Sequence, residues 1–135
     1  MKIIKTIFTC GLIMSTFTFV SAQQFNNSVL AAKASQFTQE VELNCPQYVN
    51  QDAIIINQQF LSRVEIKQQA YQSNEGFTPM SFIPLKNKCN PNLQRDENIF
   101  DPNTFNPLKY FFNFRAGVST TYRVDNTNYI IVIHP

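Results

Sequence analysis

The sequence predicts an all-β, mainly antiparallel fold, a small sandwich or barrel-like domain with a C-terminal three-strand meander, preceded by an N-terminal signal peptide helix. Three observations predict it. Apolar and polar residues alternate in several short runs, as expected for half-buried strands. Proline, glycine and asparagine separate these runs. Little of the chain after residue 22 shows the helical period of about 3.6 residues.

The first 22 residues have the three parts of a secretory signal peptide. Lys2 and Lys5 precede an apolar run over residues 7–20, and the small residues Ser21 and Ala22 follow it. The run is shorter than the roughly 20 residues that a membrane-spanning helix needs, and polar residues interrupt it. Retention as a membrane anchor is the alternative. The pattern favours cleavage near Ala22 and export, with the product secreted or periplasmic.

The chain divides into three predicted parts: a signal peptide at residues 1–22, a leader or short helix at 23–37, and a single β-rich domain at 38–135. Ser28 is a suitable cap for a short run of good helix formers. A mobile leader is the alternative, because so short a helix is marginal without packing.

Charge argues against two classes of partner. The formal net charge of +2 comes from Lys2 and Lys5, so the mature chain is near neutral. Its basic residues are scattered, and Lys86 with Lys88 is the densest pair. Nucleic acids and anionic membranes are bound by clustered positive charge, which is missing here. We therefore predict that neither a nucleic acid nor an anionic membrane is a partner. Because the signal peptide is predicted to be cleaved, we also expect no stable membrane span after cleavage. The oligomeric state stays open.

Two cysteines remain after cleavage, Cys45 and Cys89, in a compartment that permits oxidation. We predict a disulfide between them. Closing a loop of this length stabilises a fold by about 4 kcal/mol in the chain-entropy description. A reactive thiol is the alternative, but the only histidine, His134, is a poor partner base so close to the chain end.

The first half of the predicted domain contains three predicted strands. The first covers residues 38–45, in which polar and apolar residues alternate from Glu40 to Cys45 until a proline ends the pattern. Residues 53–56 are a short run rich in β-branched isoleucine, and residues 60–68 alternate over their second half. A helix over residues 54–69 is the alternative, but its apolar face would be poor.

Residues 72–107 contain most of the prolines and many asparagines, which excludes long regular elements. Phenylalanine, methionine, isoleucine and leucine nevertheless recur between residues 77 and 85. We therefore expect part of this stretch to be an edge strand or an extended segment on the core. Loops this long in a compact domain are often functional.

The last thirty residues are predicted to form the three-strand meander. Residues 108–115, 118–124 and 129–133 are the strands, with a tight turn at residues 116–117 and a second turn at residues 125–128.

The first of these strands carries an extra aromatic residue, Phe111, on its otherwise polar side. A central strand covered on both faces is the simpler explanation. The alternative is an exposed patch that binds a protein or a glycan, with Phe111 beside Asn113 and Arg115. Phe82 and Phe100 in the preceding loops complete the predicted binding residues. The chain has 13 phenylalanines and no tryptophan, which disfavours glycans.

Most catalytic chemistry lacks candidates, and we predict no catalytic residue and no cofactor. His134 lies one residue from the chain end, where fraying is usual. Zinc sites need closely spaced cysteines or histidines, and phosphate loops need several glycines, whereas the mature chain has only Gly76 and Gly117.

Carboxylates are the remaining chemical candidates. Glu40 with Glu42, or Asp96 with Asp101, could serve as an acid and base pair, although a solvated outer face is the favoured explanation for Glu40 and Glu42. Asp96, Glu97 and Asp101 are a weak calcium candidate, because their loop lacks the spacing and glycine of known calcium loops.

The sequence thus favours a small exported disulfide-containing β domain that acts as a non-enzymatic binding module, with a protein as its partner. The contact surface is predicted at residues 77–105 together with the aromatic strand. Two alternatives remain: an exported hydrolase that uses paired carboxylates, and a structural component of an envelope or extracellular matrix.

Overall fold

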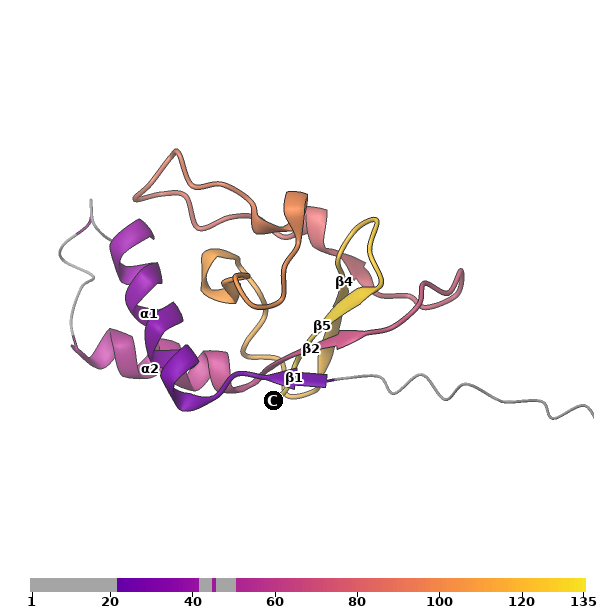
Figure 1. The fold of residues 1–135 in the computed structure, drawn as a ribbon, viewed down its shortest axis with the longest axis horizontal. Helices are drawn as coiled ribbons and strands as arrows, with labels where there is room; N and C mark the ends of the chain where they lie inside the picture. Colours follow the sequence, from indigo (N-terminus) through magenta and orange to yellow (C-terminus); the bar gives the residue numbers. More distant parts are fainter. Residues whose placement is uncertain (1–21, 42–44, 46–50) are drawn as a thin grey trace, which may run out of the picture.

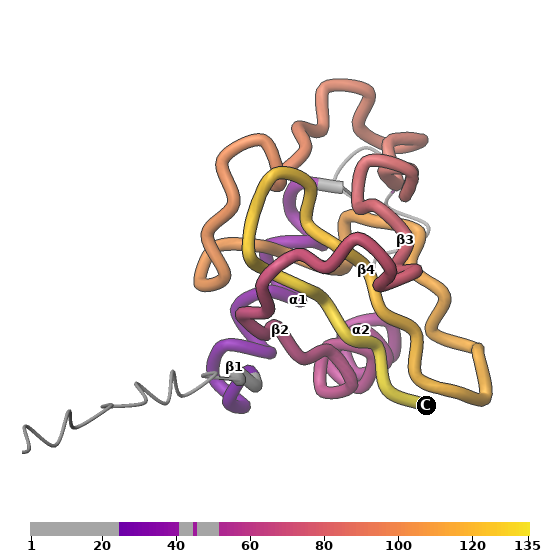
Figure 2. Tube along the Cα trace, turned by 90° about the vertical axis from the view of Figure 1, so that its right-hand side faces the viewer, coloured from indigo at the N-terminus to yellow at the C-terminus, as the bar shows by residue number. Residues whose placement is uncertain are grey.

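The computed structural model describes residues 22–41, 45 and 51–135; residues 1–21, 42–44 and 46–50 lie outside the described part. Two helices lie beside a sheet, and the loops between residues 80 and 105 rise to one side of both (Figure 1, Figure 2). The helices and strands are α1 (Asn27–Val41), α2 (Gln51–Ser62), β1 (Ala22–Gln24), β2 (Val64–Gln68), β3 (Thr78–Pro79), β4 (Thr120–Arg123) and β5 (Tyr129–Ile133). Three 3-10 turns complete the elements: η2 (Met80–Phe82), η3 (Asp96–Ile99) and η4 (Pro107–Lys109).

The predicted signal peptide falls outside the described residues, apart from Ala22, which begins β1. Within the described ranges, the helices are too short or too polar to cross a membrane.

The sheet is mixed and has five strands in the order β1-β2-β5-β4-β3. Strand β3 runs parallel to β4, and the other neighbours are antiparallel. The register places Ile131 opposite both Ile66 and Tyr122, so these buried side chains share one face of the sheet. The predicted three-strand meander is therefore wrong. Strands β4 and β5 form a hairpin, but the strand on the other side of β5 is β2, from the first half of the chain.

Strand β2 follows the predicted alternation. Val64 and Ile66 are buried in the core, whereas Glu65 and Lys67 lie on the opposite face. This confirms residues 64–68 of the predicted strand, and β5 confirms the prediction for residues 129–133. The period of two identifies these strands because each has one face on the core.

Helix α1 confirms the short helix, and not the mobile leader, for residues 27–37, and it continues into the start of the predicted strand at residues 38–45. Asn26, not Ser28, is its cap: the Asn26 Oδ1 accepts a hydrogen bond from the Val29 backbone N at 3.0 Å. Leu30, Ala34 and Phe37 are spaced by four and three residues and are all buried. The helix is stable because this stripe packs into the core, and the predicted domain boundary at residue 38 falls inside it.

Helix α2 overturns the predicted strand at residues 53–56 and supports the first part of the alternative helix. Asp52 lies in its first turn, where a negative charge interacts well with the helix dipole. Ile54 and Leu61 contact the core from one side of the helix, whereas Ile55 is about half exposed. A helix can accommodate β-branched isoleucines when tertiary packing outweighs their modest intrinsic cost.

The predicted aromatic strand at residues 108–115 is not a sheet strand. Asn106 caps the η4 turn by accepting a hydrogen bond from the Leu108 backbone N at 3.2 Å, and a proline begins that turn. The chain then runs extended, with one isolated antiparallel bridge from Tyr110 to Leu85. The side chains still alternate, because an extended segment lying on a core has the same period of two.

Two clusters of buried side chains form the core. The sheet cluster lies between the sheet and the overlying loops and comprises Val64, Ile66, Met80, Ile83, Phe105, Tyr110, Phe112, Phe114, Tyr122, Val124, Ile131 and Ile133. The helix cluster comprises Leu30, Ala34, Phe37, Leu61, Leu93 and Leu108. Helices, sheet and loops all contribute, so the all-β prediction is wrong and the fold is a mixed one with two helices and a small sheet.

Candidate functional site

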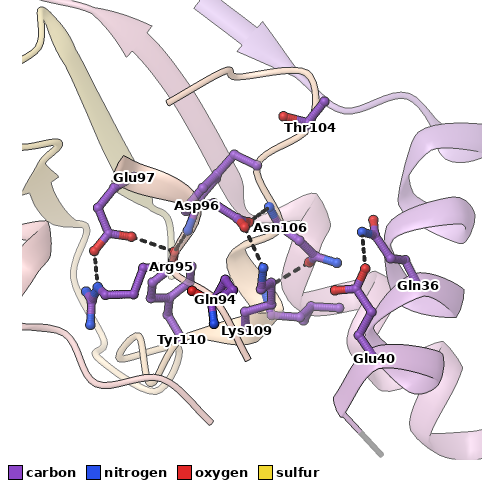
Figure 3. Close-up of polar contacts among 12 residues, drawn as sticks. Gln36, Glu40, Gln94, Arg95, Asp96, Glu97, Thr104, Asn106, Lys109 and Tyr110 are labelled. Atoms are coloured by element: carbon purple, nitrogen blue, oxygen red, sulfur yellow. Dashed lines mark hydrogen bonds and ion pairs between the residues drawn. The ribbon is translucent and has the colours of Figure 1, made fainter. Parts of the chain in front are cut away.

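The segment 77–115, here called the loop layer, is held together by buried polar contacts (Figure 3). Asp96 forms an ion pair with Lys109 and accepts a hydrogen bond from the Asn106 backbone N at 3.0 Å. The Tyr110 hydroxyl donates to Glu97 at 2.6 Å and accepts from the Asp96 backbone N at 2.7 Å. Burial, and then the hydrogen bond to Glu97, raise the pKa of Tyr110 far above its ordinary value. The layer is therefore a fixed support.

Lys33 connects α1 to this layer. Its Nζ donates hydrogen bonds to the carbonyl oxygens of Phe105 at 2.6 Å and Asn103 at 2.9 Å. In return, the Asn106 side-chain amide donates to the Lys33 carbonyl oxygen at 2.9 Å. Burial lowers the pKa of Lys33, and the nearby carboxylates of Asp96 and Asp101 oppose that shift. The lysine serves to anchor the loops, because its ammonium group is already hydrogen-bonded.

The predicted disulfide between Cys45 and Cys89 is confirmed, with a Cα–Cα distance of 5.7 Å. It joins the chain beyond α1 to the loop layer. Close to it, the Asn90 side chain donates a hydrogen bond to the Glu40 carbonyl oxygen at 2.6 Å.

Four of the five predicted binding residues lie on the outside of the loop layer. Phe82 is 75% exposed and Phe111 is 59% exposed. The Phe111 backbone N donates to the Pro84 carbonyl oxygen at 3.0 Å, which brings the segments around the two rings side by side. Asn113 and Arg115 are also exposed. The explanation of Phe111 as part of a buried central strand is therefore wrong.

We call this set the aromatic surface and define it as the exposed residues Phe82, Pro84, Phe111, Asn113 and Arg115 with the half-buried Lys86. The Lys86 Nζ lies 5.9 Å from the Phe111 ring centre. Phe100, the fifth predicted residue, is not part of it. Its ring contacts the rings of Phe105 and Tyr129, both at 5.2 Å, so it belongs to the edge of the sheet cluster.

A second feature was missed by sequence reasoning. Two clefts of about 530 and 560 Å³ meet at Asp125, Asn126 and Thr127 in the β4–β5 turn, and together we call them the turn groove. Residues 125–128 are recognisable from the sequence as a turn, and that turn is confirmed. Only the fold shows that the segment around Tyr71 and the loop around Asn98 face it from either side.

Three of the four carboxylate candidates have hydrogen-bond partners within the protein. Glu42 lies outside the described residues. Asp96 is bound to the loop layer as described above, and Asp101 accepts a hydrogen bond from the Asn103 backbone N at 2.9 Å. Glu40 shares a hollow with Asp96, but it accepts a hydrogen bond from Gln36 at 2.6 Å (Figure 3).

The calcium candidate does not form a site. The carboxylates of Asp96, Glu97 and Asp101 each have different hydrogen-bond or ion-pair partners within the protein. Within the described ranges, nowhere do three or more histidine, cysteine, aspartate or glutamate side chains gather closely enough to hold a metal ion.

His134 is not frayed, contrary to expectation. Its backbone N donates to the Arg63 carbonyl oxygen at 2.8 Å, and the Arg63 Nε donates to its carbonyl oxygen at 2.8 Å. Its ring lies between Glu65, at 2.9 Å from Nε2, and the Ser119 hydroxyl, at 3.4 Å from Nδ1. Burial raises the pKa of Glu65, but hydrogen bonds from His134 and Lys67 outweigh this and leave it below its ordinary value.

This row of serine, histidine and carboxylate has the order used in nucleophilic catalysis. The distance from Ser119 to His134 is longer than a normal O–H to N hydrogen bond. The row therefore provides a base beside a hydroxyl without the short contact of an assembled catalytic site.

Comparison with known proteins returns no match, whether to family models, to curated proteins or to solved structures.

Proposed function

We propose that this chain is an exported, non-enzymatic binding module that contacts a protein partner through the aromatic surface. The single observation that carries the proposal is the exposure of Phe82 and Phe111 on a layer whose inner side is fixed by ion pairs and a disulfide. Exposed large rings on a rigid support are the usual anchors of protein interfaces, because little conformational freedom is lost on binding.

The charge of the aromatic surface indicates the chemistry of the partner. Residues 82–88 and 111–115 contain the exposed basic residues Lys88 and Arg115 but no aspartate or glutamate. Basic side chains around an apolar centre favour a partner segment with apolar anchors and acidic neighbours. The proposed partner is therefore a protein with an acidic and apolar patch.

Export is part of the same proposal. It is supported by the signal-like pattern of residues 1–22 and by the Cys45–Cys89 disulfide, a bond that persists in oxidising compartments.

The experiment compares partners captured by three forms of the full chain from the native extract, by quantitative mass spectrometry. The forms are wild type, the double variant Phe82→Ser with Phe111→Ser, and the control Ile99→Ser, which alters a 91% exposed residue outside the aromatic surface. We expect proteins that wild type and the control retain and the double variant loses, with acidic patches among them. Equal recovery by all three forms contradicts the proposal, as does sedimentation showing that the chain only associates with itself.

A hydrolase is the second candidate, favoured by one observation: the Ser119, His134 and Glu65 row. In such an enzyme the Ser119 hydroxyl would attack an ester carbonyl while His134 takes its proton. A fluorophosphonate probe tests this. Labelling that is lost in Ser119→Ala but kept in Ser81→Ala would favour the hydrolase, and absence of labelling would remove it.

A further inference from the structure

The turn groove crosses the end of the β4–β5 hairpin. Its first cleft, of about 530 Å³, is lined by Tyr71, Phe77 and Arg123, and its second, of about 560 Å³, by Asn98 and Phe100. Each volume lies within the range of small-molecule sites. Because the clefts share the residues of the turn, a ligand with several linked units can occupy both.

The floor of the first cleft is an ion pair that is already complete. Arg123 and Glu75 each have only 7% of the side chain exposed, and the Arg123 Nε donates to Glu75 at 2.7 Å. Arg123 also donates from Nη1 to the Gln69 carbonyl oxygen at 2.6 Å. The hydrogen bonds that Glu75 accepts, foremost those from Arg123, hold its pKa below the ordinary value, so the pair stays charged at neutral pH. The floor is therefore rigid, and its two charges are already paired with each other.

In the second cleft, too, the arginine is paired with a glutamate. Arg95 is paired with Glu97 and donates from Nη2 to the carbonyl oxygens of Met80 and Ile83, both at 2.9 Å. Asp125, between the clefts, accepts hydrogen bonds from the Ser81 backbone N at 2.8 Å and hydroxyl at 3.0 Å. A phosphate, sulfate or carboxylate ligand needs a cation to receive it, and both arginines in this lining are bound to glutamates. The groove therefore suits an uncharged ligand.

The rim of the groove is rich in groups that both donate and accept hydrogen bonds. Ser73, Asn98, Asn126 and Asn128 line it and are exposed. Asn126 adopts a left-handed backbone conformation with φ of 57°, which holds the tip of the turn in one shape. Amides and hydroxyls match the hydroxyl groups of sugars, each of which also donates and accepts.

Aromatic rings form part of the walls. Tyr71 is 67% exposed, and its ring centre lies 6.0 Å from the Arg123 guanidinium, with Phe77 at 5.9 Å from the same group. A tyrosine ring held by a cation presents a flat apolar face and a polar tip. The lack of tryptophan disfavours glycans in general. The exposed Tyr71 ring nevertheless offers a flat apolar face on which the apolar side of a sugar ring can stack.

We propose that the turn groove binds a short neutral oligosaccharide, with one sugar ring stacked on Tyr71 and hydroxyl groups bonded to the asparagines of the turn. A peptide is less suitable, because the sheet edge beside the first cleft is the two-residue strand β3, whose Pro79 cannot donate a backbone hydrogen bond to an added strand. The site is separate from the aromatic surface, so the proposal does not depend on the proposed protein partner.

The test uses the full chain with its disulfide intact, on an array of immobilised neutral oligosaccharides. The probes are β-1,4-linked glucose and N-acetylglucosamine, α-1,4-linked glucose, and mannose oligomers. We expect at least one series to bind, and calorimetric titration to show that Tyr71→Ala weakens that binding about tenfold or more, since one stacked ring is typical of a hot spot. Asn128→Ala should weaken it to a smaller extent.

Two controls separate the outcomes. Tyr71→Phe keeps the ring and should retain most of the affinity, and Phe111→Ser should bind the sugar as wild type does. Circular dichroism of each variant checks folding, which should not change because the altered side chains are exposed. The proposal is overturned if no neutral oligosaccharide binds at about 10 mM, a concentration that detects even millimolar affinity. It is also overturned if binding survives Tyr71→Ala.

Discussion

The two faces of residues 110–115 differ sharply in exposure. Tyr110, Phe112 and Phe114 point inward and are less than 9% exposed, whereas Phe111 points outward and is 59% exposed. The inward rings contact one another, with centre distances of 5.7 Å and 6.4 Å along the row. The same residue type therefore serves as core on one face and as surface on the other, and the difference lies in what covers it.

The outer face of residues 110–115 is held without the hydrogen bonds of a sheet strand. Inward rings and buried ion pairs hold the loop layer from below, and the disulfide holds it from the side of α1. Substitutions on the inner and outer faces should therefore change the free energy of unfolding by different amounts.

Removing an inward ring should have the largest effect. Phe112 is 7% exposed and lies 4.8 Å from the Tyr122 ring centre. Phe112→Ala leaves a cavity in the sheet cluster and should lower the free energy of unfolding by about 3–5 kcal/mol. Urea denaturation of the full chain measures it. A loss below about 1 kcal/mol would mean that this face is not core.

Breaking the disulfide should come next. The double variant Cys45→Ser with Cys89→Ser should lose about 2–4 kcal/mol of stability, because the unfolded chain gains freedom. Limited proteolysis should then cut the loop layer near residue 89 faster than in wild type. Unchanged proteolysis with reduced stability would show that the inward rings alone hold the layer.

Tyr110 tests the polar part of the inner face. Tyr110→Phe leaves Glu97 without the hydroxyl donor and should lower the free energy of unfolding by about 1–3 kcal/mol at neutral pH. The raised pKa of Tyr110 adds a pH dependence. In the folded protein the hydroxyl stays protonated, while in the unfolded chain it ionises near pH 10.

The contribution of the protonated Tyr110 hydroxyl to the free energy of unfolding is complete below about pH 10. It is lost as the pH rises further, by up to about 1.4 kcal/mol per pH unit. Wild type should therefore lose stability above pH 10 more steeply than Tyr110→Phe, as denaturation curves from pH 8 to 11 would measure. Parallel pH profiles of the two proteins would contradict the assignment.

The outer ring should have the smallest effect on stability. Phe111→Ala should change the free energy of unfolding by no more than about 0.5 kcal/mol, because the side chain is mostly in water. The matched pair with Phe112→Ala shares residue type, substitution and segment, so the difference between them measures the two faces directly. Equal losses would erase the distinction.

Several features could be predicted from the sequence because they depend on local pattern or chemistry. Strands β2 and β5 alternate over a buried face, the turn at residues 125–128 is rich in turn formers, and Cys45 with Cys89 are the two cysteines left after the predicted signal. Of the candidate sites, exposure on the loop layer was an open alternative for Phe111, whereas the turn groove could not be predicted. Its walls come from three separate stretches of the chain, residues 71–81, 95–100 and 123–128.

Other features were decided by the tertiary structure alone. The isoleucines of α2 and the alternating residues at the end of α1 match a strand in a short window, and they are helical because each helix packs a stripe of side chains into the helix cluster. His134 is tied down because Arg63 lies beside it across the sheet.

The disulfide, two strands, the 125–128 turn and the near-neutral charge of residues 23–135 follow from the sequence alone, since each depends on residue type or on a period of two. Which segments became helices, which face of the aromatic segment met water and where the clefts formed depended on long-range packing, because burial is set by the element that lies opposite.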